Sequence, residues 1–159
     1  MQITPDQALE TVQSIFKSLD WGIEVRTDPP AILTGFHIDK TRDAIVAIAL
    51  DDERRSIILG CSYRFQTPKD QRGKIRRFLF EESQNLYGTN IHFSPSQGVN
   101  INTRCWLPDL PLATDDLRAV VEPYLKSVLK TSTCIFPALI RFLREQERLR
   151  PQDGFYLPS

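Results

Sequence analysis

Histidine and cysteine are scarce in this chain, which has two histidines and three cysteines in 159 residues. They never occur in a CxxC, HxxxH or HExxH pattern, so we expect no metal site and no cofactor. The odd number and wide spacing of Cys61, Cys105 and Cys134 exclude a disulfide framework. Unpaired cysteines are typical of a reducing compartment, so we expect a cytoplasmic protein.

Excess charge of either sign is also absent, because 20 basic residues balance 20 acidic ones. This balance argues against nucleic acid as a partner. No apolar run approaches the length of a membrane span, and residues 1–13 lack the pattern of a secretory signal. The length and the apolar content of 41% predict one domain over residues 1–150, followed by a loose tail over 151–159.

The hydrophobic periodicity predicts an α+β protein. Thr4 and Gln7 form a capping box that begins a helix. The remaining elements are predicted as strands near 23–26, 32–38, 43–50 and 56–65, a helix over 69–88, a hairpin over 91–106, and two helices, 114–130 and 134–149, separated by Thr131–Thr133. Residues 43–50 are nearly all apolar, which predicts a strand covered on both faces.

The stretch SPSQGVNINTRCWLPDL, residues 94–110, begins like a phosphate-binding loop. A strand pattern follows it and no lysine is present, so a hairpin turn with Gly98 at positive φ is favoured. Cys105 continues the apolar face of this strand, and no base is placed beside it. We interpret it as a buried small hydrophobe rather than a nucleophile.

Trp106 lies on the opposite face of the same strand, as do Asn100, Asn102 and Arg104. We expect Trp106 to pack beneath Leu107 and the connector that follows. The alternative is an exposed anchor for a partner.

The helix over 69–88 is rich in cations. A wheel of about 100° per residue places Phe80 and Tyr87 away from its core stripe, beside Arg76 and Lys69. One interpretation is an interface with another protein or with a second copy. The other is that an element of the same chain, such as the last helix, covers these aromatic residues. RNA binding through Arg72, Arg76 and Arg77 is a third interpretation, which the zero net charge disfavours.

The element order over residues 63–129 resembles that of the YbjN family: a strand that ends at Pro68, a helix, a two-stranded hairpin and a long helix. That family is similar in fold to the type III secretion chaperones. The resemblance implies an antiparallel sheet with helices packed on one face, and the order predicted for the whole chain is α-ββββ-α-ββ-α-α. It also implies a dimer that binds extended segments of client proteins, with no catalytic residues to carry over. The helix over 134–149 is an addition to this pattern.

The leading hypothesis is therefore a non-enzymatic, chaperone-like or regulatory module that binds a protein or peptide and forms a homodimer. The candidate interface residues are Lys69, Arg76, Phe80, Tyr87, Arg104 and Trp106. One alternative is a small enzyme that uses His92, Asn100, Asn102 and Arg104 on the hairpin. Another is a nucleic-acid-associated regulator that uses the basic start of the helix over 69–77.

Overall fold

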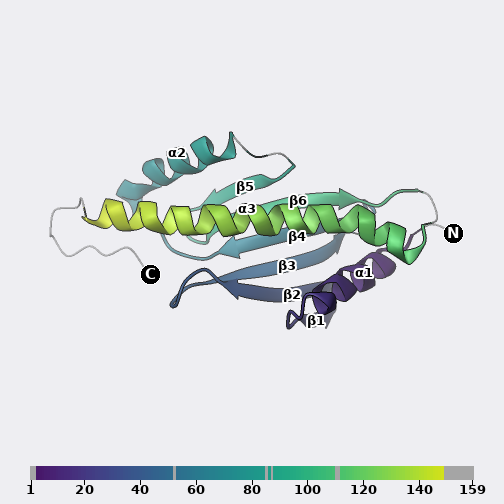
Figure 1. The fold of residues 1–159 in the computed structure, drawn as a ribbon. Coiled ribbons are helices and arrows are strands. Elements are labelled where there is room, and N and C mark those ends of the chain that lie inside the picture. The colour runs from purple at the N-terminus through teal and green to yellow at the C-terminus, as the bar shows by residue number, and fades with distance from the viewer. Residues whose placement is uncertain (1–2, 52, 85, 87, 110–111, 149–159) are drawn as a thin grey trace.

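A computed structural model describes residues 3–51, 53–84, 86, 88–109 and 112–148 (Figure 1). The elements are α1 (Pro5–Ser18), β1 (Glu24–Thr27), β2 (Pro30–His37), β3 (Asp43–Asp51), β4 (Ser56–Tyr63), the 3-10 turn η1 (Lys69–Gln71), α2 (Arg72–Ser83), β5 (Asn90–Ser94), β6 (Gly98–Trp106) and α3 (Thr114–Arg148). The predicted capping box begins α1, because the Thr4 hydroxyl accepts from the Gln7 N–H at 3.2 Å and the Gln7 side chain accepts from the Thr4 N–H at 2.9 Å. The predicted tail lies outside the described residues.

The six strands form one antiparallel sheet in the order β1-β2-β3-β4-β6-β5. The first four strands follow one another by hairpins. The chain then passes through α2 and returns at β5, which lies at the far edge, while β6 fills the position beside β4 (Figure 1). The predicted α+β class is confirmed.

All three helices pack on one face of the sheet. Helix α1 contacts β2, β3 and β4, α3 contacts β4 and β6, and α2 contacts β5. Alternate residues of the strands are buried beneath them, as the two-residue period of a strand requires. This helix-covered face contains Val46, Ile48, Ile57, Leu59, Cys61, Val99, Ile101 and Cys105, which pack against Val12, Ile15, Phe16, Leu125, Val128, Phe136 and Leu139 of the helices.

The opposite face of the sheet, the open face, carries no helix of the described chain. The prediction that β3 is covered on both sides is therefore wrong. Ala44, Val46 and Ile48 are buried, whereas Ile45 between them is 40% exposed and Ala47 is exposed as well. The strand is apolar on both faces, although only one face is covered.

The two helices predicted after residue 114 are one continuous helix, α3, of 35 residues. The expected break at Thr131–Thr133 is absent because the buried side of the helix continues through it, from Val128 to Ile135 and Phe136, and two of these hydroxyls find partners within the helix. Ser132 Oγ donates to the Val128 carbonyl at 2.7 Å, and Thr133 Oγ1 donates to the Lys130 carbonyl at 3.0 Å. Pro123 and Pro137 both lie inside the helix.

Helix α2 is shorter than predicted and ends at Ser83. The Phe80 carbonyl near its end accepts from Ser83 Oγ at 2.6 Å and from Gln84 Nε2 at 3.4 Å. These side chains satisfy the carbonyl where the backbone ladder stops.

The hairpin between β5 and β6 is confirmed. The Gln97 N–H bonds to the Ser94 carbonyl at 3.1 Å, and Gly98 has φ +104°. A Cβ atom on Gly98 would lie 2.2 Å from the Tyr63 carbonyl oxygen and 2.8 Å from the Phe65 nitrogen. The hairpin thus approaches the backbone after β4 so closely that only glycine fits.

Replacing Gly98 with alanine should lower the free energy of unfolding by at least about 2 kcal/mol, because it adds a backbone clash to a strained φ. Urea unfolding followed by circular dichroism measures this change. Gly73→Ala is the matched control: its Cβ would have no neighbour within 4 Å, and Gly73 lies in the first turn of α2, so the free energy of unfolding should stay the same or rise by less than about 1 kcal/mol. Equal stability of Gly98→Ala and the wild type would contradict the close approach.

Candidate protein-binding site

Phe80 lies on the exposed side of α2, with 65% of its surface accessible. The core side of the same helix is formed by Ile75 and Leu79, which are buried, and by Phe78, whose ring stacks on Phe142 of α3 at 4.8 Å. The last helix therefore covers Phe78 and leaves Phe80 exposed. This outcome contradicts the interpretation in which the chain itself covers Phe80.

A shallow groove separates α2 from β5. It has a volume of about 290 Å³ and is lined by Arg76, Leu79, Phe80, Ser83, Ile91 and Phe93. The guanidinium of Arg76 lies 5.6 Å from the centre of the Phe93 ring, within the range of a cation–π contact. The α2–β5 groove is thus apolar along its base and cationic at one side.

Strand β5 is an edge strand of the sheet. It pairs with β6 on one side, and no strand of the described chain pairs with it on the other. An edge of this kind presents a row of N–H and C=O groups to a further strand. Ile91 and Phe93 pair with Ile101 and Val99, so their side chains lie on the helix-covered face, toward the groove.

The other residues predicted for the interface on α2 lie in different places. Lys69 is exposed in η1, the turn that precedes α2, rather than on the helix itself. Tyr87 lies outside the described residues. Among the arginines of the nucleic-acid hypothesis, Arg77 pairs with Glu81 at 3.2 Å, and Arg72 has a buried Nε without a partner among the described atoms. One of these arginines is thus neutralised by a glutamate and another is partly buried. RNA binding through them stays a prediction.

Trp106 is 58% exposed on the open face, so the expectation that it packs beneath Leu107 is wrong. Leu107 is itself buried, and its N–H bonds to the Arg55 carbonyl at 3.0 Å. The neighbouring Arg104 lies 5.4 Å from the Trp106 ring. The alternation of the strand places both residues on the correct face, but it does not show that no described helix covers that face.

Arg104 is held by a network on this face. Its Nη1 lies 2.6 Å from Asp51 Oδ2 and 2.6 Å from Ser56 Oγ. The hydrogen bond from Arg104 holds the pKa of the Asp51 carboxyl below its usual value, so the pair is charged at neutral pH.

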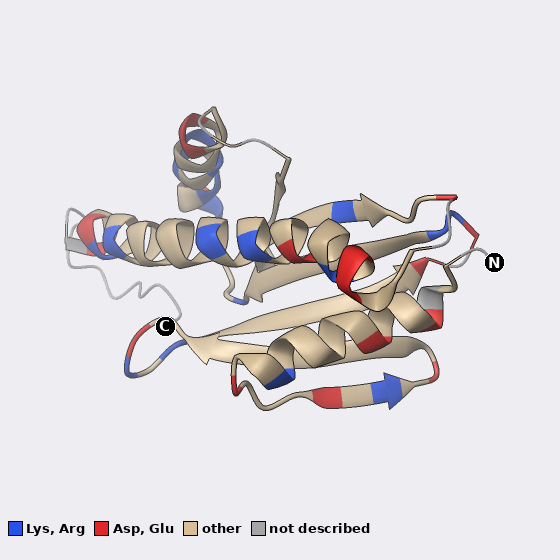
Figure 2. Ribbon diagram, turned by 45° about the vertical axis from the view of Figure 1, so that its right-hand side comes forward, with Lys and Arg blue, Asp and Glu red and all other residues tan. Residues whose placement is uncertain are grey.

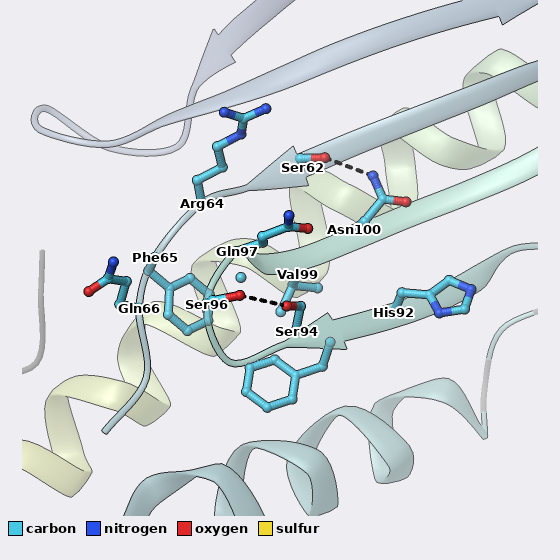
Figure 3. A pocket seen from close by; sticks show the side chains of 12 residues that line it. Ser62, Arg64, Phe65, Gln66, His92, Ser94, Ser96, Gln97, Val99 and Asn100 are labelled. Atoms are coloured by element: carbon cyan, nitrogen blue, oxygen red, sulfur yellow. Dashed lines mark hydrogen bonds between the residues drawn. The ribbon is translucent and has the colours of Figure 1, made fainter. Parts of the chain in front are cut away.

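A larger pocket of about 730 Å³ lies at the turn end of the hairpin (Figure 3). His92 and Asn100 line it, whereas Asn102 and Arg104 do not. Asn100 donates to Ser62 at 2.7 Å, and Asn102 donates to Asn100 at 2.6 Å. The four residues of the enzyme hypothesis are therefore not brought together in one cavity, and no carboxylate lines this pocket.

The cysteines fit their structural interpretation. Burial raises the pKa of the Cys105 thiol to about 11. Burial likewise raises the pKa of Cys61 to about 11, with a nearby Ser132 hydroxyl opposing it in part. Cys134 is exposed on α3. No group of three or more histidine, cysteine, aspartate or glutamate residues suited to a metal ion occurs among the described residues.

Comparisons with known proteins give little beyond the fold. No family model matches the chain, and no curated protein matches it. Membership of the YbjN family therefore stays a prediction. Among solved structures, the chain is similar to a chain in the crystal structure of the ExsC–ExsE complex. The match has 10% identity and a TM-score of 0.49, and covers 87% of this chain and 96% of the other.

That likeness concerns the arrangement of helices and strands and assigns neither a partner nor an activity. No helix in the described part of the chain is long and apolar enough to cross a membrane. Sequence reasoning missed Ile91 and Phe93 as members of the site. Their strand was predicted, but its place at the edge depends on the order of strands in the sheet, which no local pattern shows.

Only one thiol of the native protein, that of Cys134, should react rapidly with a disulfide reagent at pH 8. A thiol with a pKa near 11 is ionised in about one molecule in a thousand at that pH. The release of thionitrobenzoate measures the count, with all three thiols reacting after denaturation. Cys134→Ser should remove the rapid phase, and a second rapid thiol in that variant would contradict the buried state of Cys61 and Cys105.

Proposed function

We propose that this protein is a non-enzymatic, chaperone-like binding module, which holds an extended segment of a partner protein against the outer edge of β5. The observation that carries the proposal is Phe80, 65% exposed at the α2–β5 groove beside an edge strand. A homodimer in the cytoplasm completes the proposal.

The addition of a strand from the partner would use both the free edge of β5 and the α2–β5 groove. An added strand lies about 4.8 Å from its neighbour and bonds to it through main-chain groups. Its alternate side chains then project toward the helix-covered face, where α2 and β5 form the groove. Main-chain bonds supply affinity for many sequences, whereas the groove selects an apolar side chain.

The chemistry of the groove supports binding rather than catalysis. Its lining residues provide one guanidinium, one hydroxyl and four apolar side chains, with no carboxylate, imidazole or thiol among them. Covering an exposed phenylalanine contributes up to about 1.5–3 kcal/mol, which is enough to make Phe80 a main anchor.

The proposal is tested with peptides selected from a displayed random library on the wild-type protein, then labelled and titrated by fluorescence anisotropy. Phe80→Ala should raise the dissociation constant about tenfold, equivalent to about 1.4 kcal/mol. Tyr124→Ala is the matched control, because Tyr124 is an aromatic residue 38% exposed on α3 that does not line the groove. It should leave the affinity unchanged.

A second measurement addresses the main-chain bonds. Methylation of the peptide nitrogens at alternate positions should weaken binding in one of the two registers and not in the other, because only every second N–H of an added strand faces β5. Unchanged affinity in Phe80→Ala, or tolerance of methylation in both registers, would exclude this site. Circular dichroism melting checks that each variant is folded.

A further inference from the structure

We infer that the open face of the sheet is where two copies of this chain pack against each other, sheet to sheet. The inference rests on the dimeric part of the proposed function and names its surface. It concerns the side of the molecule away from the helices, so it is separate from the α2–β5 groove.

The strand register defines the open face as three rows across the sheet. One row runs through Ala31, Ala49, Ile58 and Arg104; the next through Leu33, Ala47, Gly60, Asn102 and Asn90; and the third through Gly35, Ile45, Ser62, Asn100 and His92. Small or apolar residues form the centre of these rows, and Trp106 lies beyond the first.

Apolar side chains on this face are exposed to water. Ile45 is 40% exposed and Trp106 is 58% exposed, and Ala47 is exposed between two buried neighbours. Each helix of the described chain packs on the other face, so none of them shields these residues. Small residues at the centre allow a second sheet to approach to the usual separation of about 10 Å.

Two ion pairs on the open face form within the chain. Arg104 pairs with Asp51 at 2.6 Å and Arg26 with Glu24 at 3.1 Å, and the His37 ring lies within hydrogen-bond distance of Asp43, at 2.5 Å. The central strands carry no Lys, Arg, Asp or Glu between their ends except Arg104 (Figure 2). Over the central strands Arg104 is therefore offset by Asp51, and the cation Arg64 lies beyond the end of β4, at the pocket of Figure 3.

A second copy of the chain fits this surface. A face whose charges are internally balanced is complementary to itself, and a two-fold interface uses the same patch on both molecules. From strand spacing and rise, the face covers roughly 600 Å² in projection. Side-chain relief increases the accessible area toward the roughly 800 Å² per partner of a standard interface. Trp106, oriented by Arg104, provides an aromatic anchor at one end.

The test is sedimentation equilibrium of the full chain over a wide range of concentration. The wild type should be a dimer, and Ala47→Glu should raise the dimer dissociation constant at least about 100-fold, because symmetry places two unpaired carboxylates in the interface. Val25→Glu is the matched control. Val25 is a strand residue 51% exposed, but it pairs with Ile32 and so lies on the helix-covered face.

Ile45→Lys provides a second variant of the open face and should give the same dissociation with the opposite charge. Thermal melting and peptide affinity should be near the wild type for a folded monomeric variant. A wild type that is monomeric at every concentration would overturn the dimer. A dimer that neither variant weakens would overturn this surface alone. Neither result bears on the peptide site, which Phe80→Ala tests separately.

Discussion

The packing of one apolar stripe of α3 on strands β4 and β6 is the interaction on which the rest of the structure depends. At 1.5 Å per residue, a helix of 35 residues is about 52 Å long, and it runs across the length of the sheet (Figure 1). Val128 and Phe136 are fully buried along it. Helix α1 packs against α3 as well as against the sheet. Near the C-terminal end of α3, the ring of Phe142 stacks on Phe78 of α2. A single long helix thus places the other two.

The one-sided arrangement creates two surfaces of different kinds. Where α2 meets β5, an edge strand and an exposed phenylalanine lie at a corner of the molecule, which suits a narrow, extended ligand. Behind the sheet lies a broad face with small side chains and balanced charges, which suits another flat surface. The two proposals use these surfaces independently, so a dimer formed through the open face would leave both of its grooves accessible on the outside.

Short sequence patterns correctly predict the features that depend only on residues close together in the chain. The capping box of Thr4 and Gln7, the alternation of β6 and the positive φ of Gly98 were all predicted correctly, since each depends on residues close in sequence. The errors concern tertiary coverage. Apolar residues on both sides of β3 predict two covered faces, and Trp106 is predicted to be packed, but one face of the sheet is open. The Ser132 and Thr133 hydroxyls bond back into the helix, which residue type alone does not distinguish from a break. Exposure of Phe80 could be proposed from the wheel, but its position beside an edge strand could not.

Helix α2 is attached to the molecule mainly through the end of α3 and through β5. Phe78 stacks on Phe142, Lys74 donates to Gln146 at 3.0 Å, and the contacts to β5 complete the attachment. Helix ends fray more readily than their centres, and cooperative units open together. Fraying of the last turns of α3 would therefore reach α2 through Phe78 and Lys74. The position of α2, and with it one side of the groove beside Phe80, thus depends in part on residues more than 60 positions further along the chain.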